Sequence, residues 1–345
     1  MPESDRSPDP PPESFSPAKR WAWFFIKWTL CLLVLWFVGR RAFELWQQED
    51  WSRIQFNIGW LVLAGVAYAA GWLPSVWYWR TMIHRVGGRV RFDDAARAHY
   101  CGHLGKYVPG KATVLVIRSA LLKDRGAPVT VSVLTATCET LMMMATGAAL
   151  AVALLPWLMG TEQTANLPAW GSWIMAAPWL PGLIVVLACL VLSPIIASLL
   201  TLLAVKFTPE GMMGGERRVE ITPGLVIGGL AAFAGSWLLH GLSLGLTLRA
   251  VGDSMNWSAW PVWTGGVAGA TAVGFAALFA PGGLGVREGL LLEVLSVQPD
   301  VTPGQAVVAP LLLRAVWFIS EICLAAVLYY GVRPKPASET PPRQR

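Results

Sequence analysis

The chain has 345 residues, of which 54% are hydrophobic and only 14% charged, and its formal net charge is +6. A soluble protein carries roughly 25% charged residues, because its surface must be hydrated. This composition excludes an ordinary soluble enzyme and indicates a protein that lies largely in lipid.

The first twenty residues form a predicted disordered, Pro-rich tail on the cytoplasmic side. Residues 1–17 contain six Pro and four acidic residues, and such a segment buries too little apolar surface to fold. It has neither the charged start nor the apolar centre of a signal peptide. We therefore expect the apolar segment that follows to be retained as a membrane anchor.

Apolar segments of membrane-spanning length follow along the chain. Each comes near the roughly 20 residues that cross about 30 Å of hydrocarbon. The predicted crossings are residues 21–38, 58–79, 129–158, 179–205, 225–248 and 306–330. The sequence thus predicts an all-α polytopic membrane protein with about six full transmembrane helices. Its membrane domain spans residues 21–331, with half-repeats at about 58–205 and 225–331, and residues 332–345 form a cytoplasmic tail.

The distribution of basic residues predicts the orientation. Residues 80–128 contain ten Lys and Arg, residues 159–178 none, residues 206–224 three, and the C-terminal tail four. Cytoplasmic loops carry the excess of Lys and Arg. We therefore expect both termini to lie in the cytoplasm and the protein to lie in the inner membrane of the cell. Basic loops beside apolar spans face anionic lipid headgroups. We therefore expect this positive charge to interact with lipid and not with nucleic acid.

Two apolar segments do not fit as crossings. Residues 99–117 contain Lys106, Lys111 and a turn at Pro109 and Gly110. Residues 258–298 are interrupted by turn residues, Pro281, Gly282, Gly283 and Gly285. Each segment is predicted to enter the membrane and leave on the same side as a re-entrant helical hairpin. Irregular backbone at that depth needs protein or a water-filled cavity around it, so a polar cavity is expected.

The two interruptions resemble each other. The first has Tyr107-Val-Pro-Gly-Lys followed by Arg118-Ser-Ala-Leu-Leu, and the second has Phe279-Ala-Pro-Gly-Gly followed by Arg287-Glu-Gly-Leu-Leu. The predicted orientation places the first hairpin on the cytoplasmic side and the second on the outer side. This arrangement is typical of an inverted-topology repeat around a central substrate site. Channels also contain opposed half-helices, so the repeat alone leaves the mode of transport open.

Charged residues inside the apolar segments are the candidate site. A charge at the bilayer centre costs at least about 2.5–3.5 kcal/mol, so such residues pair with each other or contact a charged substrate. We favour contact with a substrate phosphate, because the planar guanidinium of arginine suits that group. The predicted substrate-binding residues are Lys106, Lys111, Arg118, Glu139, Arg287, Glu288, Arg314 and Glu321.

Neither a metal nor an organic cofactor is predicted. His99, Cys101 and His103 lie close in sequence, but no carboxylate or second Cys lies near them. His240 is interpreted as an interhelical contact, and the five scattered Cys as small apolar side chains. The sequence contains no recognisable catalytic motif, so we expect no enzymatic activity.

The two interrupted segments carry a family resemblance. Gly105-Lys-Tyr-Val-Pro-Gly-Lys with Arg118, and Pro281-Gly-Gly-Leu-Gly-Val-Arg-Glu-Gly, are similar to two signatures of the lysylphosphatidylglycerol synthase transmembrane region. That region is the flippase-like domain of the multiple peptide resistance factor, and the likeness covers about residues 21–330. It implies movement of a phospholipid headgroup, such as aminoacylated phosphatidylglycerol, between leaflets. The positions that it implicates are Lys106, Pro109, Gly110, Lys111, Arg118, Pro281, Gly282, Gly283, Gly285, Arg287 and Glu288.

The resemblance leaves the lipid and two alternative functions open. Full-length synthases add a soluble aminoacyltransferase domain, whereas this chain continues only to residue 345 after its last predicted crossing. We expect a translocase for an anionic or aminoacylated phospholipid, or for a polyprenyl-linked lipid or glycolipid. One alternative is an accessory protein that anchors a lipid-modifying enzyme or a glycosyltransferase through residues 80–128. Assembly into a homo-oligomer is left open. The other is a membrane-embedded transferase, although the sequence has no D-x-D motif.

Overall fold

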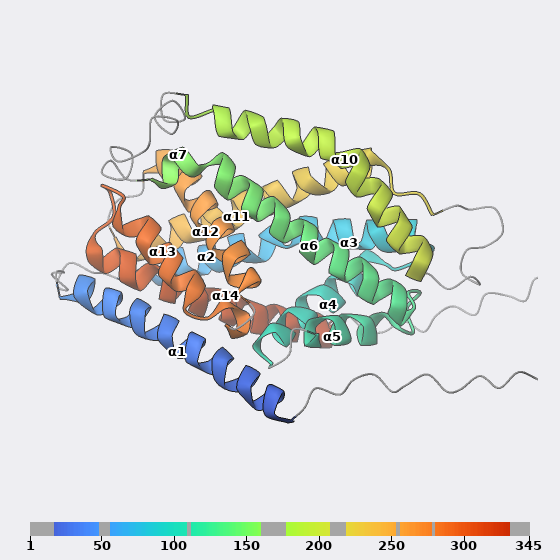
Figure 1. Ribbon diagram of the computed structural model, residues 1–345, viewed down its shortest axis with the longest axis horizontal. Helices are drawn as coiled ribbons and strands as arrows, with labels where there is room; N and C mark the ends of the chain where they lie inside the picture. Colours follow the sequence, from blue (N-terminus) through green and yellow to red (C-terminus); the bar gives the residue numbers. More distant parts are fainter. Residues whose placement is uncertain are drawn as a thin grey trace, which may run out of the picture.

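The computed structural model describes residues 17–47, 56–108, 112–159, 177–207, 219–252, 256–277 and 280–331. These residues form helices and connecting turns and contain no β-strand (Figure 1). The long helices run roughly parallel or antiparallel to one another. In chain order the helices are α1 (Pro17–Trp46), α2 (Ile58–Gly71), α3 (Leu73–Arg85), α4 (Phe92–His103), η2 (Leu104–Tyr107), α5 (Thr113–Leu122), α6 (Val129–Ala153), α7 (Leu155–Leu158), α10 (Leu180–Phe207), α11 (Pro223–Val251), η4 (Trp257–Ala259), α12 (Trp260–Ala276), η5 (Pro281–Gly283), α13 (Val286–Ser296) and α14 (Pro303–Gly331).

Five helical segments among the described residues are long and apolar enough to cross a membrane. They are Ile58–Arg85, Val129–Ala153, Leu180–Phe207, Pro223–Val251 and Pro303–Gly331. Five of the six predicted crossings coincide with them. The remaining predicted crossing, residues 21–38, lies within α1, which is helical but is not one of these five segments.

The first spanning segment consists of two helices, α2 and α3, that meet at Trp72. Pro74 lies in the first turn of α3, where the missing N–H of proline is tolerated. The N–H of Trp72 closes α2 on the carbonyl of Ala69 at 3.3 Å. This junction brings Tyr68 and Ser75, one from each helix, into the interior of the bundle, where both are buried.

Helix α11 lies at the centre of the bundle and packs against α2, α6, α10, α12 and α14. Glycines allow the close approach of large aromatic rings. A Cβ atom on Gly229 would lie 2.4 Å from the Tyr78 ring, and one on Gly245 would lie 2.3 Å from the Trp263 ring. Small residues at helix contacts are how membrane helices pack closely, because the surrounding lipid is as apolar as the side chains.

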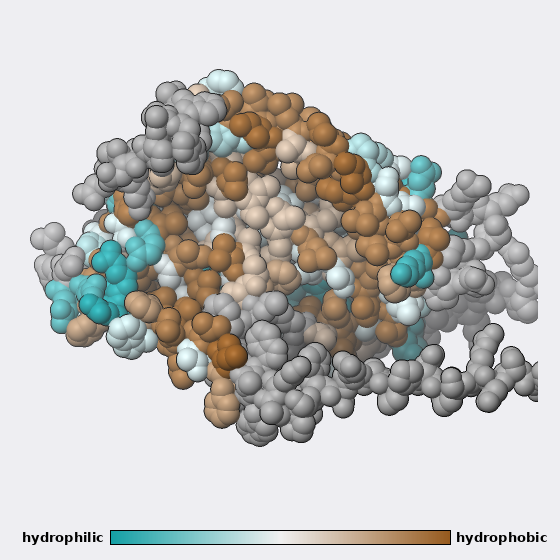
Figure 2. All heavy atoms as spheres, viewed as in Figure 1, coloured by the Kyte–Doolittle hydropathy of each residue, from teal (hydrophilic) through white to brown (hydrophobic). Residues whose placement is uncertain are grey.

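Large apolar side chains cover the outside of the bundle. On α10, Ile184, Val191 and Ile195 are more than half exposed, and Figure 2 shows hydrophobic residues over much of this face. The same figure shows hydrophilic residues gathered mainly toward the two ends of the long axis. An apolar middle between polar ends is the surface that a membrane-embedded bundle requires.

The predicted loop at residues 80–128 is more ordered than expected. Helix α4 begins at Phe92 rather than near His99, and its residues 95–103 are all buried. Three small residues, Ala95, Ala96 and Ala98, let this helix enter the bundle ahead of the predicted apolar segment. Cys101 and Cys138 are buried as expected, whereas Cys323 is exposed on α14.

Candidate functional site

Two pairs of short helices approach each other at the centre of the bundle. Helices α4 and α5 have 12 and 10 residues, and α12 and α13 have 17 and 11. At 1.5 Å per residue each helix is shorter than the roughly 30 Å of a bilayer's hydrocarbon core. The turns that interrupt the pairs, η2 and η5, contact each other, and the pairs extend from there toward opposite ends of the molecule (Figure 1).

Glycines make the second turn possible. Gly282, Gly283 and Gly285 have φ angles of 61°, 70° and 83°, a left-handed conformation that other residues adopt at a cost. The predicted turn residues therefore lie at the interruption between α12 and α13. Gly282 also approaches η2, because a Cβ atom on it would lie 3.6 Å from the carbonyl oxygen of Lys106. The predicted turn and site residues Pro109, Gly110 and Lys111 lie outside the described residues.

A small cavity of about 30 Å³ lies beside the two turns. Such a volume holds a water molecule or two. Four of the predicted site residues line it, and three of these are cations. The lining residues are Lys106, Tyr107, Gly282, Arg287, Glu288, Leu291, Pro310, Leu313, Arg314 and Trp317.

Glu288 is held in place from two sides. One of its oxygens accepts a hydrogen bond from the backbone N–H of Gly285 at 2.7 Å, which caps the start of α13. The other oxygen forms an ion pair with Arg314 of α14. This pair connects the second interrupted helix pair to the last spanning helix.

Arg287 has a different environment from Arg314. Its guanidinium lies over the Trp317 ring, with 5.2 Å between its central carbon and the ring centroid. Among the described residues it forms no ion pair with a carboxylate. The aliphatic part of Arg287 is packed tightly, because a Cβ atom on Gly274 would lie 2.4 Å from its Cγ. Arg287 is therefore a positioned cation beside the cavity, stabilised by an aromatic ring.

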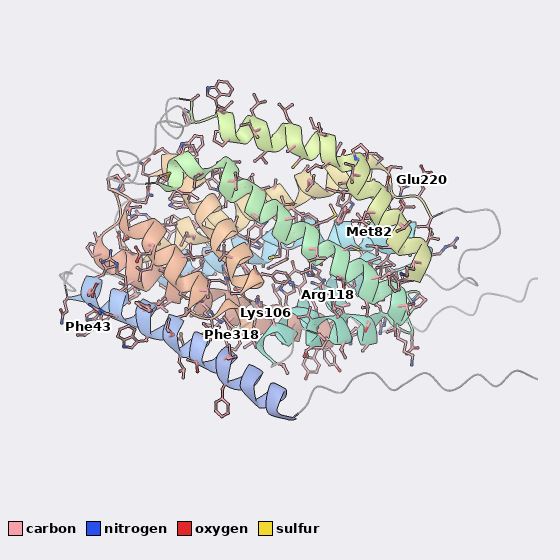
Figure 3. The ribbon with its side chains drawn as sticks, viewed as in Figure 1. Phe43, Met82, Lys106, Arg118, Glu220 and Phe318 are labelled. Carbon is pink, nitrogen blue, oxygen red and sulfur yellow. The ribbon has the colours of Figure 1, made fainter. Side chains whose placement is uncertain are left out.

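The third cation, Lys106, pairs with Glu321 of α14. Glu321 is only 1% exposed and also accepts a hydrogen bond from the Tyr68 hydroxyl. The Tyr68 ring stacks on Trp317 at a centroid distance of 4.4 Å. The same tryptophan therefore contacts both Arg287 and the tyrosine that binds Glu321. In Figure 3, Lys106 lies toward the middle of the bundle, whereas Phe43 and Glu220 lie at its edge.

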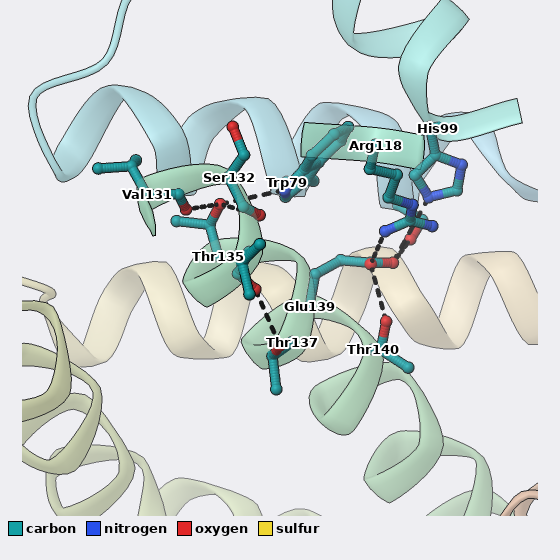
Figure 4. A network of polar contacts seen from close by, with 11 residues as sticks. Trp79, His99, Arg118, Val131, Ser132, Thr135, Thr137, Glu139 and Thr140 are labelled. Carbon is teal, nitrogen blue, oxygen red and sulfur yellow. Dashed lines mark hydrogen bonds and ion pairs between the residues drawn. The ribbon is translucent and has the colours of Figure 1, made fainter. Parts of the chain in front are cut away.

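Arg118 and Glu139 form a second polar cluster, shown in Figure 4. Arg118 donates to Glu139 at 2.7 Å, and the two side chains are 3% and 1% exposed. The Ser75 hydroxyl also donates to this carboxylate, and the Arg118 guanidinium lies 5.1 Å from the centroid of the Trp79 ring. Neither charged residue of this cluster lines the cavity.

Two buried histidines lie between the carboxylates of the two clusters. His99 Nε2 is 3.6 Å from Glu139, and His103 Nδ1 is 3.8 Å from Glu321. Helix α4, which carries both rings, is outside the five spanning segments. Burial lowers the pKa of His99 to about 3 and that of His103 to about 4, so both rings are neutral at pH 7. No group of three or more metal-ligating side chains occurs in the described part of the chain.

Sequence reasoning missed the aromatic and hydroxyl residues of the site. Tyr68 and Ser75 bind the two buried carboxylates, and Trp317 supports Arg287. A signal for Trp317 was available, because it follows Arg314 by three residues and so shares a helix face with it. With 19 Trp in the chain, that position did not stand out from those expected at the membrane interfaces.

The long apolar helices and the charges buried among them define a multi-pass membrane protein. The chain belongs to the lysylphosphatidylglycerol synthase TM region family, whose model matches residues 24–325. A comparison with curated proteins finds no match. The family membership and the apolar helices together make this a membrane domain of a lipid-related family, as the two motifs predicted.

Proposed function

We propose that the protein moves a lipid with a phosphate-containing headgroup between the two leaflets of a membrane. The observation that carries this proposal is Arg287, a cation without a carboxylate partner among the described residues, beside a central cavity. Lys106 and Arg314 line the same cavity, and Glu288 is the one carboxylate among its lining residues. A headgroup phosphate would balance the excess positive charge there.

Arginine and lysine in this arrangement suit a phosphate better than a neutral headgroup. The guanidinium fork donates two parallel hydrogen bonds to phosphate oxygens. Lys106 and Arg314 already have carboxylate partners, so a phosphate would exchange with those carboxylates as it enters. The acyl chains stay in the bilayer, and only the headgroup needs a polar path.

The two interrupted helix pairs supply that path in the proposed mechanism. Helices α4 and α5 enter from the end of the molecule that carries the basic turns, and α12 and α13 enter from the other end. In this proposal they are equivalent hairpins, one in each half of an inverted repeat. The present cavity is too small for a headgroup, so this is a closed state. Separation of η2 from a neighbouring helix opens one side, and separation of η5 opens the other.

Leaflet exchange in liposomes tests the proposal. The purified full chain is reconstituted with fluorescent phosphatidylglycerol, and the label in the outer leaflet is reduced chemically over time. We expect exchange well above that of empty liposomes. Arg287→Gln should slow it about 10- to 100-fold, since a hydrogen bond to a charged group is worth about 1.5–3 kcal/mol.

A matched control comes from an exposed arginine. Arg40 on α1 is 64% exposed and forms an ion pair with Glu44 of the same helix, so Arg40→Gln should leave exchange unchanged. Aminoacylated phosphatidylglycerol and a polyprenyl phosphate, tested in the same liposomes, identify the preferred headgroup. Exchange equal to that of empty liposomes for every phosphate-containing lipid would contradict the proposal and favour the accessory role.

A further inference from the structure

Glu139 and Glu321 are connected by a row of buried side chains that the binding of a headgroup does not explain. His99 Nε2 faces Glu139 at 3.6 Å, and His103 Nδ1 faces Glu321 at 3.8 Å. The two imidazole rings lie 4.7 Å apart between centroids, with 33° between their planes. Four groups that can hold a proton therefore lie in sequence through the middle of the bundle.

Three nitrogens and one oxygen in this row form no hydrogen bond in the described part of the chain. Among the described residues, neither ring nitrogen of His99 forms a hydrogen bond, nor does Nδ1 of His103 or Oε2 of Glu321. All of these atoms are buried. A buried polar group without a partner is costly, and its presence in a native structure is a sign of function rather than of stability.

Other helices surround the row with charged, titratable and aromatic groups. Helix α3 presents Ser75 and Trp79 to the Glu139 end, and Trp72 packs edge-on against the His103 ring at 4.1 Å. The titratable and charged groups that interact with the row are Tyr68, Tyr78, Tyr100, Lys106, Tyr107, Arg118, His240 and Arg287. Each carboxylate in the row has one cation as its ion-pair partner, Lys106 for Glu321 and Arg118 for Glu139.

We propose that Glu321, His103, His99 and Glu139 carry a proton that accompanies each lipid headgroup. This inference rests on the proposed function. When a phosphate draws Lys106 away, Glu321 loses its cation among neutral rings and takes up one proton. The proton leaves Glu321 for water on the opposite side of the membrane when the lipid is released and Lys106 returns.

The histidines deliver that proton without any net change in their own charge. A proton from water bonds first to the Glu139 carboxylate, which passes it to Nε2 of His99 and remains a carboxylate paired with Arg118. Nδ1 of His99 releases its proton to Nε2 of His103, and Nδ1 of His103 gives its own proton to the Glu321 carboxylate. Rotation of both rings restores the starting tautomers. Small ring rotations close the 3.6 Å and 3.8 Å gaps. Histidine suits this transfer because one ring nitrogen accepts a proton while the other releases one, so the ring ends neutral, and buried Glu and His chains serve as proton relays in transporters.

The proposed stoichiometry of one proton per lipid predicts how the lipid distributes between the two leaflets. One proton with one singly charged anionic lipid is electroneutral, so a pH gradient, and not a membrane potential, drives the movement. At equilibrium, one pH unit should enrich phosphatidylglycerol about tenfold in the leaflet on the alkaline side. Liposomes containing the full chain and an interior pH indicator report lipid distribution and proton uptake together.

The expected variants separate the relay from the binding site. His99→Gln should slow lipid exchange and proton uptake together, because this ring delivers the proton to Glu321 in the proposed path, whereas Arg287→Gln should slow exchange with the number of protons per lipid unchanged. His84, which bonds to the carbonyl of Val90 at 2.8 Å outside the row, gives the control His84→Gln, which should behave as the unaltered protein does. Lipid exchange that ignores the gradient in the unaltered protein would overturn the proton step and leave the translocase standing. A complete lack of exchange would instead contradict the proposed function.

Discussion

The charges of Arg118 and Glu139 depend on each other, since both side chains are almost fully buried, 3% and 1% exposed. Taking two charges out of water costs several kcal/mol per ion, and their attraction roughly offsets that cost when the geometry is good. Here the 2.7 Å contact and the Ser75 hydrogen bond provide that geometry. The pair therefore adds little net stability, but the loss of either partner leaves a charge that nothing compensates.

Single substitutions of this pair should destabilise the protein strongly. We expect Glu139→Ala or Arg118→Ala to lower the free energy of unfolding by about 3–5 kcal/mol, because the remaining charge is buried and unpaired. Thermal unfolding of the purified protein in detergent, followed by intrinsic Trp fluorescence, measures the change.

The double substitution is the control for this prediction. Replacing both residues with Met removes both charges together, so Arg118→Met with Glu139→Met should recover most of the stability lost in either single variant. If each single variant melts like the unaltered protein, the two residues do not depend on each other. A functional loss in the double variant at full stability would instead favour the predicted contact with substrate.

At the scale of elements, the close contact of α12 and α13 positions Arg287, the cavity cation that has no carboxylate partner among the described residues. Gly274 of α12 faces the side chain of Arg287, and a Cβ atom at this position would lie 2.4 Å from Cγ. The aliphatic stem of Arg287 thus passes through the space that the missing Cβ leaves. The direction of the guanidinium toward Trp317 depends on this contact.

Gly274→Ala should therefore impair lipid exchange although it removes no charge. We expect a loss similar in direction to that of Arg287→Gln, because the displaced stem moves the guanidinium from the cavity. The matched control is Gly228→Ala on α11, where a Cβ atom meets nothing within 4 Å. Both changes improve helix propensity by up to about 1 kcal/mol, so intact stability with lost exchange only in Gly274→Ala supports the positioning role. Equal exchange in the two variants would contradict it.

The sequence was sufficient to predict the helices and turns that are determined by neighbouring residues in the chain. Apolar length located five spanning helices, and the Pro-Gly motif located the interruption at η5. The start of α4 at Phe92 and its burial from Ala95 were not predicted, because its first turns contain Asp93, Asp94 and Arg97. Asp94 is paired with Arg125 in the turn after α5, a contact that the local pattern of α4 does not show.

The charged residues of the candidate site could be predicted from the sequence, but which of them form ion pairs with each other could not. The sequence identified Arg314, Glu288 and Glu321 as charged residues within apolar segments, but it did not predict which residues they pair with. The structure pairs Arg314 with Glu288 and Glu321 with Lys106. Such pairing follows from how α14 meets η2 and α13, and periodicity within one helix carries no information about that.

At the scale of the whole molecule, the two ends differ in charge. The described turns at one end hold Arg85, Arg89, Arg91, Lys123 and Arg125. The other end brings together the start of α2 and the end of α11, since the N–H of Asn57 donates to the carbonyl of Ala250 at 2.9 Å. The neighbouring turn carries Asp300, which accepts a hydrogen bond from Asn256 at 3.1 Å. The basic residues gather in the turns of the first end, although Arg249 lies beside Ala250 at the other, and such an excess is what the positive-inside rule reads as orientation.

We expect the end with the basic turns to face the cytoplasm of the cell whose membrane contains the protein. After replacement of the five native Cys, single cysteines at two exposed positions, Lys123→Cys and Ser258→Cys, mark the two ends. A membrane-impermeant maleimide should label position 258 in intact cells or spheroplasts, and position 123 only after the membrane is opened, because the basic turns remain on the side from which the chain is inserted. Labelling of position 123 from outside would reverse the orientation, and with it the side from which α4 and α5 admit a headgroup.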